Sequence, residues 1–100
     1  MPRGPARLRT PDGLKNQIGT HVKSRRIDLG FSQDQLCAKI AQITGGVWNP
    51  DFQELYRLEA GKRIVTTLEL PVLAEALDID ILWLLHGETQ ESSEQTQKSE

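Results

Sequence analysis

The chain has little of what disulfide-linked or membrane-spanning proteins require. Its 100 residues include one cysteine, Cys37, which cannot form an internal disulfide and which we expect to be a small core residue in a reducing cytoplasm. The longest apolar run, 79–85, is interrupted by Asp80 and is too short to cross a bilayer. The first 14 residues are basic but lack the apolar stretch of a signal peptide. These absences predict a cytoplasmic protein with no membrane contact.

Patterns for catalysis and for metal binding are also missing. His21, His86 and Cys37 are scattered along the chain without ligand spacing, so we expect no metal. There is no recognisable nucleophile and base, there are no paired catalytic carboxylates, and the glycines at 45–46 lack the flanks of a phosphate-binding loop. We therefore predict that the protein is not an enzyme and takes no cofactor.

The sequence also lacks the strict alternation of apolar and polar residues that marks strands. Apolar residues recur instead at helical spacing, which predicts an all-α, compact five-helix bundle. The length allows one domain with a small core. We assign that domain to residues 11–87. Residues 1–10 are predicted to form a basic flexible arm, and residues 88–100, which include no apolar side chain, a disordered acidic tail.

Charge is distributed unevenly along the chain. The net charge is −2, yet residues 1–26 hold seven of the twelve Lys and Arg against one acid, which gives them +6 and leaves −8 for the rest. A basic amino end can follow a nucleic-acid backbone or enter a minor groove through Arg3, Arg7 and Arg9. The alternative is that this end is simply solvated.

Capping residues delimit the first two predicted helices. Thr10 as N-cap, with a proline at the next position, predicts a helix over residues 11–29. Gly30 supplies a left-handed end to that helix. Ser32 and Gln35 form a Ser-x-x-Gln capping box that opens the second helix. The buried stripe of the second helix is expected to consist of Leu36, Cys37, Ile40 and Ile43.

The third helix follows a long turn that contains Trp48. Asn49 and Asp51 are both plausible N-caps, and the sequence does not decide between them. Leu55 and Leu58 are expected to face inward, and Gly61 to end the helix.

Two shorter helices are predicted after the third. The fourth starts either at a second capping box opened by Thr66, which leaves Pro71 awkwardly in the second turn, or near Glu69 or Leu70, which makes Pro71 harmless. Asp80 is expected to cap a fifth helix over residues 81–85, whose five successive apolar residues are too many for one buried face.

Several short motifs occur in a characteristic order across these helices. They are Ile18, Gly19, Val22, Arg26, Gly30, Phe31, Ser32, Gln33, Leu36, Ile40, Leu55, Leu58, Glu59, Ala60, Gly61, Lys62, Arg63, Leu73, Ala74, Ala76, Leu77, Trp83, Leu84, Leu85 and Gly87. With them, residues 14–87 resemble the lambda-repressor-like, Cro-type (xenobiotic-response-element) helix-turn-helix family. Extra residues at 42–49 resemble a subgroup with an extended second helix and a long turn before the third, and Asp78 replaces a glycine common in the family.

The resemblance implies a fold and a function: a lambda-repressor-like DNA-binding domain with a helix-turn-helix. Such a domain binds duplex DNA sequence-specifically, with its third helix in the major groove, and acts as a transcriptional regulator that represses by occupying an operator. Gln33 is then expected to contact phosphate; the alternative is a merely exposed first-turn residue. Gln53 is the first choice for base reading, since a glutamine amide can pair with adenine. The predicted DNA-binding residues are Gln33, Phe52, Gln53, Glu54, Tyr56, Arg57, Lys62 and Arg63.

The resemblance also implies a structural ion pair between Arg26 and Glu59. The apolar fifth helix makes Leu82, Trp83 and Leu84 candidates for a homodimer contact, whereas the alternative places Trp83 in the core of a single chain.

The main rival function is a protein-protein interaction module on the same fold, in one version the antitoxin component of a toxin-antitoxin pair. Asp51 and Glu54 favour it because both repel phosphate on the presumed reading face. A basic face in the folded domain would favour DNA, and a neutral or acidic face would favour a protein partner. The residues that would form the basic face are Lys23, Arg25, Gln33, Lys62 and Arg63.

Overall fold

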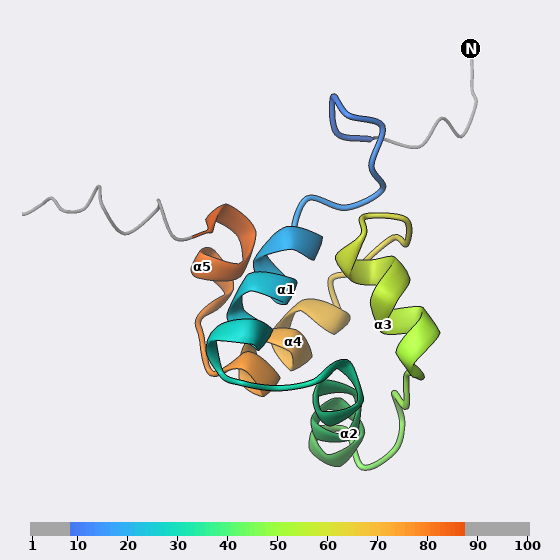
Figure 1. Cartoon of the computed structure of the whole chain (residues 1–100), viewed down its shortest axis with the longest axis vertical. Helices are drawn as coiled ribbons and strands as arrows, with labels where there is room; N and C mark the ends of the chain where they lie inside the picture. Colours follow the sequence, from blue (N-terminus) through green and yellow to red (C-terminus); the bar gives the residue numbers. More distant parts are fainter. Residues whose placement is uncertain (1–8, 88–100) are drawn as a thin grey trace, which may run out of the picture.

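Five helices make up the described part of this computed structural model, residues 9–87 (Figure 1). They are α1 (Gly19–Asp28), α2 (Gln33–Ile43), α3 (Phe52–Glu59), α4 (Glu69–Leu77) and α5 (Ile81–His86). Residues 9–87 contain no strand, so the predicted all-α, five-helix fold class is confirmed. None of these helices is long and apolar enough to cross a membrane. Residues 1–8 of the predicted arm and the predicted tail, 88–100, lie outside the described residues.

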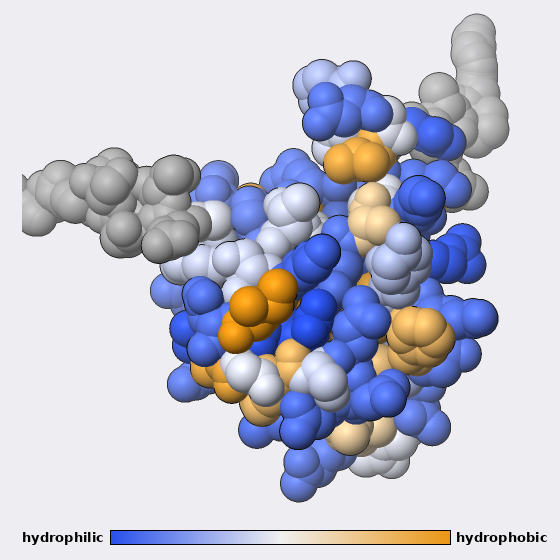
Figure 2. All heavy atoms as spheres, viewed as in Figure 1, coloured by the Kyte–Doolittle hydropathy of each residue, from blue (hydrophilic) through white to orange (hydrophobic). Residues whose placement is uncertain are grey.

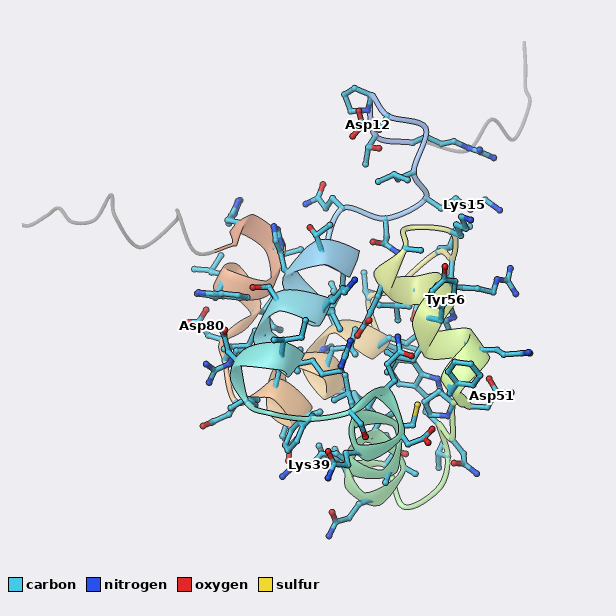
Figure 3. All side chains as sticks on the ribbon, viewed as in Figure 1. Asp12, Lys15, Lys39, Asp51, Tyr56 and Asp80 are labelled. Carbon is cyan, nitrogen blue, oxygen red and sulfur yellow. The ribbon has the colours of Figure 1, made fainter. Side chains whose placement is uncertain are left out.

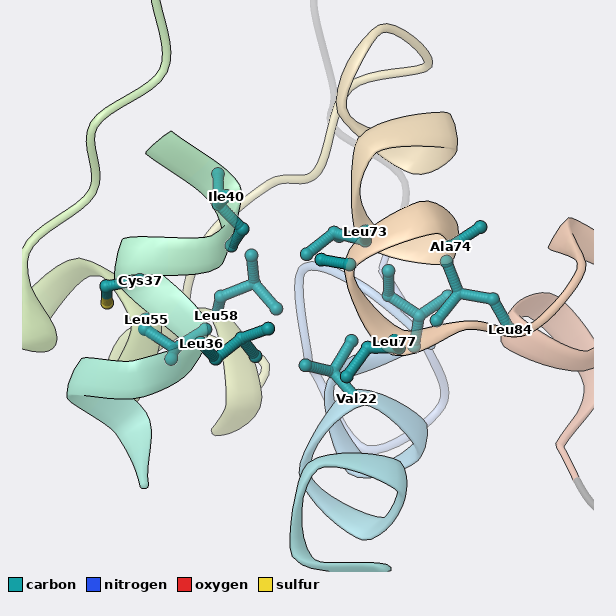
Figure 4. Packing of buried hydrophobic residues seen from close by; sticks show 12 residues of the cluster. Val22, Leu36, Cys37, Ile40, Leu55, Leu58, Leu73, Ala74, Leu77 and Leu84 are labelled. Atoms are coloured by element: carbon teal, nitrogen blue, oxygen red, sulfur yellow. The ribbon is translucent and has the colours of Figure 1, made fainter. Parts of the chain in front are cut away.

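The helices surround one core, with α4 in contact with α1, α2 and α5 (Figure 1). Helix α3 packs against α1 and α2. Figure 4 shows apolar side chains from all five helices converging. The buried apolar residues are Ile18, Val22, Leu36, Cys37, Ile40, Leu55, Leu58, Leu73, Ala74, Ala76, Leu77 and Leu84. The core therefore holds α3 by its inner face only.

Helix α1 begins at Gly19, so the predicted start at Pro11 is wrong. The hydroxyl of Thr10 does cap a backbone N–H, but the N–H belongs to Leu14 (3.0 Å) and the result is a turn. Ile18 is the N-cap of α1, and the carboxamide oxygen of Asn16, two residues earlier, accepts hydrogen bonds from the N–H groups of Ile18 (3.1 Å) and Gly19 (2.8 Å). A local pattern at Thr10 was thus mistaken for the start of the helix.

The end of α1 and the start of α2 are confirmed. Gly30 has a φ of 78°, in the left-handed region that favours glycine, and the next N–H, from Phe31, donates to the carbonyl of Arg26 (3.0 Å). The Ser32 hydroxyl accepts from the N–H of Gln35 (3.0 Å), and the Gln35 carboxamide oxygen accepts from the N–H of Ser32 (2.7 Å). The capping box is complete.

The open alternatives at α3 and α4 are also decided. Asp51 caps α3, since its carboxylate accepts from the N–H of Glu54 (2.8 Å). Thr66 and Glu69 exchange the two hydrogen bonds of a capping box, yet α4 itself begins at Glu69. Pro71 therefore lies in the first turn, where its missing N–H removes no helical hydrogen bond.

The connection from α4 to α5 turns through a residue with positive φ. Asp78 adopts φ 56° and ψ 49°, the left-handed conformation that a glycine would take with less strain. The Arg25 guanidinium caps this end of α4 by donating from Nε to the carbonyl of Leu77 (2.9 Å). Asp80 then caps α5, as predicted, by accepting from the N–H of Trp83 (2.8 Å).

Candidate nucleic-acid interface

Helix α3 has a buried face and a solvent-exposed face. Leu55 and Leu58 are each 1% exposed and anchor it in the core. The side chains of Phe52, 51% exposed, and Tyr56, 54% exposed, lie one turn apart on the outer face. These two aromatic residues line one shallow hollow together with Gln53 and Arg57. We call these four residues, Phe52, Gln53, Tyr56 and Arg57, the outer strip of α3.

A buried ion pair fixes the inner face of α3 to α1. The Arg26 guanidinium donates to both carboxylate oxygens of Glu59, at 2.7 and 3.1 Å, and to the carbonyl of Phe31 at 2.9 Å. Arg26 is 9% exposed and Glu59 6% exposed. The structure thus contains the pair that the family resemblance implies.

Gln33 joins this pair from the first turn of α2. Its side-chain N–H donates to Glu59 at 3.1 Å, so the amide leans toward the ion pair. A glutamine amide has a second N–H and a carbonyl oxygen, which leaves two groups for a ligand. The phosphate contact stays a prediction, and the observed bond gives Gln33 a structural role as well.

A second charge cluster lies beside the N-terminal half of α3, centred on Arg63. Its guanidinium bonds both carboxylate oxygens of Glu69, each at 2.8 Å, and the carboxylate of Glu54 at 2.8 Å. The hydrogen bond from Arg63 lowers the pKa of Glu69 below its ordinary value, against the opposing effect of burial. The same bond raises the pKa of Arg63. Both groups are therefore held in their charged forms.

Trp48 completes the Arg63 cluster. The guanidinium carbon of Arg63 lies 5.5 Å from the centre of the Trp48 ring, and the indole N–H donates to Glu54 at 3.3 Å. The backbone N–H of Trp48 donates to the hydroxyl of Thr44 at 3.0 Å, and this bond attaches the turn to the end of α2. The extra residues before α3 thus form an anchored turn.

These contacts involve two of the residues that were predicted to bind DNA. Glu54 and Arg63 were both predicted to touch DNA, and the structure engages both in the cluster around Trp48. Their DNA contacts stay predictions, and the observed bonds favour a structural role. Arg63 is one cation shared by two carboxylates, Glu54 and Glu69, so the cluster keeps a net charge of −1 beside α3. Asp51 remains exposed at the start of α3.

The five residues that were expected to form one basic face make different contacts in the structure. Lys23 and Lys62 are exposed and lie in no ion pair among residues 9–87. Arg25 caps α4, while Gln33 and Arg63 bond carboxylates. The predicted face is therefore not uniformly basic.

Two residues at this site were missed. The N–H of Lys15 donates to the carbonyl of Gly61 at 2.7 Å. The Asn16 side-chain amide donates to the carbonyls of Leu58 at 3.0 Å and Arg63 at 2.8 Å, beyond the bonds that its oxygen accepts at the start of α1. The long-range bonds of Asn16 leave no local signature in the sequence.

Helix α5 needs a correction. Leu84, predicted at a dimer surface, is 0% exposed and belongs to the core. Trp83 is half-buried, with its ring edge-on to His21 at a centroid distance of 6.2 Å, whereas Leu82 is 61% exposed. On the face shown in Figure 2, hydrophilic residues predominate and apolar ones form separate spots.

Within residues 9–87, Cys37 and the His, Asp and Glu side chains form no cluster that could bind a metal. Burial raises the pKa of the Cys37 thiol to about 11, which keeps it protonated at neutral pH. No group of three or more His, Cys, Asp or Glu side chains is placed to hold a metal in the described part of the chain. No protein-family model matches the chain. Function is therefore inferred from α3 and its surroundings.

Proposed function

We propose that the protein is a small transcriptional regulator that binds duplex DNA sequence-specifically and represses by occupying an operator. In this proposal α3 enters the major groove and α2 crosses the phosphate backbone. The observation that carries it is the outer strip of α3, which combines an amide, a guanidinium and two aromatic rings on one exposed face. The resemblance of residues 14–87 to Cro-type proteins supports the same function.

The chemistry of the outer strip suits base edges. The Gln53 amide can donate to adenine N7 and accept from adenine N6, a pairing worth roughly 1–3 kcal/mol of discrimination. Phe52 can contact a thymine methyl group, and Arg57 can reach guanine or a phosphate. Of the acidic residues of α3, Glu59 is buried against Arg26 and does not face a ligand.

The deciding experiment is selection of bound sequences from a random duplex pool, followed by titration of the selected duplex against salt. The parent, Gln53→Ala and Gln42→Ala are compared. Gln42 is an exposed glutamine on α2 and serves as the matched control. We expect the parent to enrich one motif and to bind it with a steep salt dependence. Gln53→Ala should relax the preference at one position, while Gln42→Ala behaves as the parent.

Absence of enrichment, with weak sequence-independent binding, would contradict this function. It would favour the second candidate, a protein-interaction module, which the exposed rings of Phe52 and Tyr56 support because aromatic residues are enriched in protein interfaces. A cross-linked partner that is lost on Tyr56→Ala would establish that candidate.

A homodimer remains part of the proposal, since repressors of this type pair two reading helices with two half-sites. With Leu84 in the core, the dimer contact on α5 rests on Leu82 and on Ile81, which is 37% exposed. Sedimentation of the parent and Leu82→Ala at high concentration tests it. A parent that stays monomeric with and without the selected duplex would rule out the dimer.

A further inference from the structure

We propose that Lys15, Arg57 and Lys62 form one phosphate-binding site, here called the basic corner, which grips the DNA backbone beside the end of α3. This inference rests on the proposed function and assigns Lys15, which lies outside the helices, to the DNA-binding surface. The ligand is the phosphodiester backbone of a duplex, and the contact is independent of sequence.

Backbone hydrogen bonds bring the three residues together. The N–H of Lys15 donates to the carbonyl of Gly61 at 2.7 Å, and the N–H of Lys62 donates to the carbonyl of Arg57 at 2.8 Å. Gly61 and Lys62 are neighbours in the chain, so these two bonds place the main chains of all three residues at the end of α3. Figure 3 shows Lys15 beyond Tyr56 along α3, at the end opposite Asp51.

Lys15 is fixed at this position by its neighbours in the chain. Asn16 bonds the carbonyls of Leu58 and Arg63, and its oxygen accepts from the N–H of Gly19, the first residue of α1. Leu14 lies against Gly61, where an added Cβ would be 3.1 Å from the leucine side chain. The segment before α1 is therefore attached to the end of α3, and Lys15 moves with the reading helix.

The charges of the corner are available to a ligand. All three side chains are exposed, and none takes part in an ion pair among residues 9–87. The arginines that do pair, Arg26 and Arg63, are held by carboxylates on other sides of α3. Like charges gathered without counter-ions destabilise the free protein slightly, and an anionic ligand relieves that repulsion.

The length of α3 is consistent with a contact between the C-terminal end of the helix and a DNA phosphate. A helix of eight residues is about 12 Å long, so when its first turns reach base edges its far end lies about 12 Å away along the helix axis. When the outer strip reaches base edges, a lysine at the end of the helix is within reach of the phosphates that border the groove. Arg9, exposed at the start of the described chain, adds charge before the same segment.

Lys15→Gln tests the corner, because it removes the charge and leaves the backbone bond to Gly61 intact. Each phosphate contact contributes about 0.9 to the slope of log affinity against log salt. We expect Lys15→Gln to reduce that slope by about 0.9 and the affinity at 0.1 M salt by about five- to tenfold, with the selected motif unchanged. Lys15→Arg should restore both. Lys39→Gln removes the same charge from an exposed lysine on α2, away from the corner (Figure 3), and should match the parent.

The outcomes separate this inference from the proposed function. A parent that selects a motif, with Lys15→Gln indistinguishable from Lys39→Gln, would overturn the corner and leave the function standing. A parent that selects no motif and binds no duplex would overturn both. A change of preferred motif in Lys15→Gln would also overturn the inference, since it would mean base reading.

Discussion

The two sides of α3 carry their charges in opposite states. Toward the core, the Arg26 guanidinium and the Glu59 carboxylate are buried and bonded at 2.7 Å. Toward solvent, Arg57 and Lys62 are exposed and take part in no ion pair among residues 9–87. The paired charges orient the helix, and the unpaired charges remain available to a partner. Charge type alone therefore does not tell which charged residues in and around α3 stabilise the fold.

The largest effect is expected when Arg26, the buried cation on the core side of α3, is removed. Arg26→Ala leaves Glu59 buried without its partner, and loss of one member of a buried pair costs about 3–5 kcal/mol. For a domain with a small core this is a large share of the free energy of unfolding. Urea denaturation should show the loss, while Lys23→Ala, an exposed cation on the same helix, stays near the parent. Unchanged stability with weakened DNA binding would reverse the assignment of Arg26.

The next largest loss of stability is expected where the backbone of α1 at Gly19 lies against the backbone at the end of α3. A Cβ on Gly19 would lie 2.4 Å from the carbonyl oxygen of Leu58 and 2.6 Å from that of Glu59, and neither backbone atom can rotate away. Gly19→Ala must push α1 from α3, which we expect to cost about 1–3 kcal/mol. Thermal melting beside Ser24→Ala, an exposed position on α1, measures it. A melt equal to the control would mean that the two helices are not in close contact.

The sequence predicts what short-range chemistry decides. Ser32, Gly30 and Asp80 were assigned correctly because each acts on a backbone group within a few residues. The start of α1 was wrong because Asn16 is held by carbonyls 42 and 47 residues away. No pattern around position 16 contains those partners.

The same limit applies to the candidate site. The position of Gln53 on the outer face follows from helical spacing against Leu55 and Leu58. The partners of Arg63 do not, since its bonds depend on how the Trp48 turn and α4 meet in space. Leu84 was misplaced because five successive apolar residues do not reveal which one faces the core.

A smaller effect is expected at the Arg63 cluster, through pH. The pKa of Glu69 is lowered in the folded protein, so the folded state binds fewer protons there than the unfolded state. The resulting stability is present above the ordinary pKa of 4.5 and is lost as the pH falls through the lowered value. The melting temperature of the parent should therefore fall more between pH 5 and about 3 than that of Glu69→Gln. Glu75→Gln, exposed on α4, is the control; a parallel fall in Glu69→Gln would contradict the ion pair.

The smallest effect on stability is expected on the outer side. Arg57→Gln removes an exposed charge that has no ion-pair partner among the described residues, so the free energy of unfolding should change by less than about 0.5 kcal/mol. Its affinity for the selected duplex should nevertheless decrease. A stability loss as large as that of Arg26→Ala would remove the contrast between the two sides of α3.

The attachment of Asn16 to the end of α3 also has a consequence for folding kinetics. Its bonds to Leu58 and Arg63 close loops of 42 and 47 residues, whereas most helix contacts are local. Closing a long loop costs chain entropy before any bond forms, so we expect this attachment to form late, after the helices have packed. Asn16→Ala should then accelerate unfolding while leaving the folding rate nearly unchanged. The residue that joins the start of α1 to the end of α3 would in this way set how long the folded state lasts.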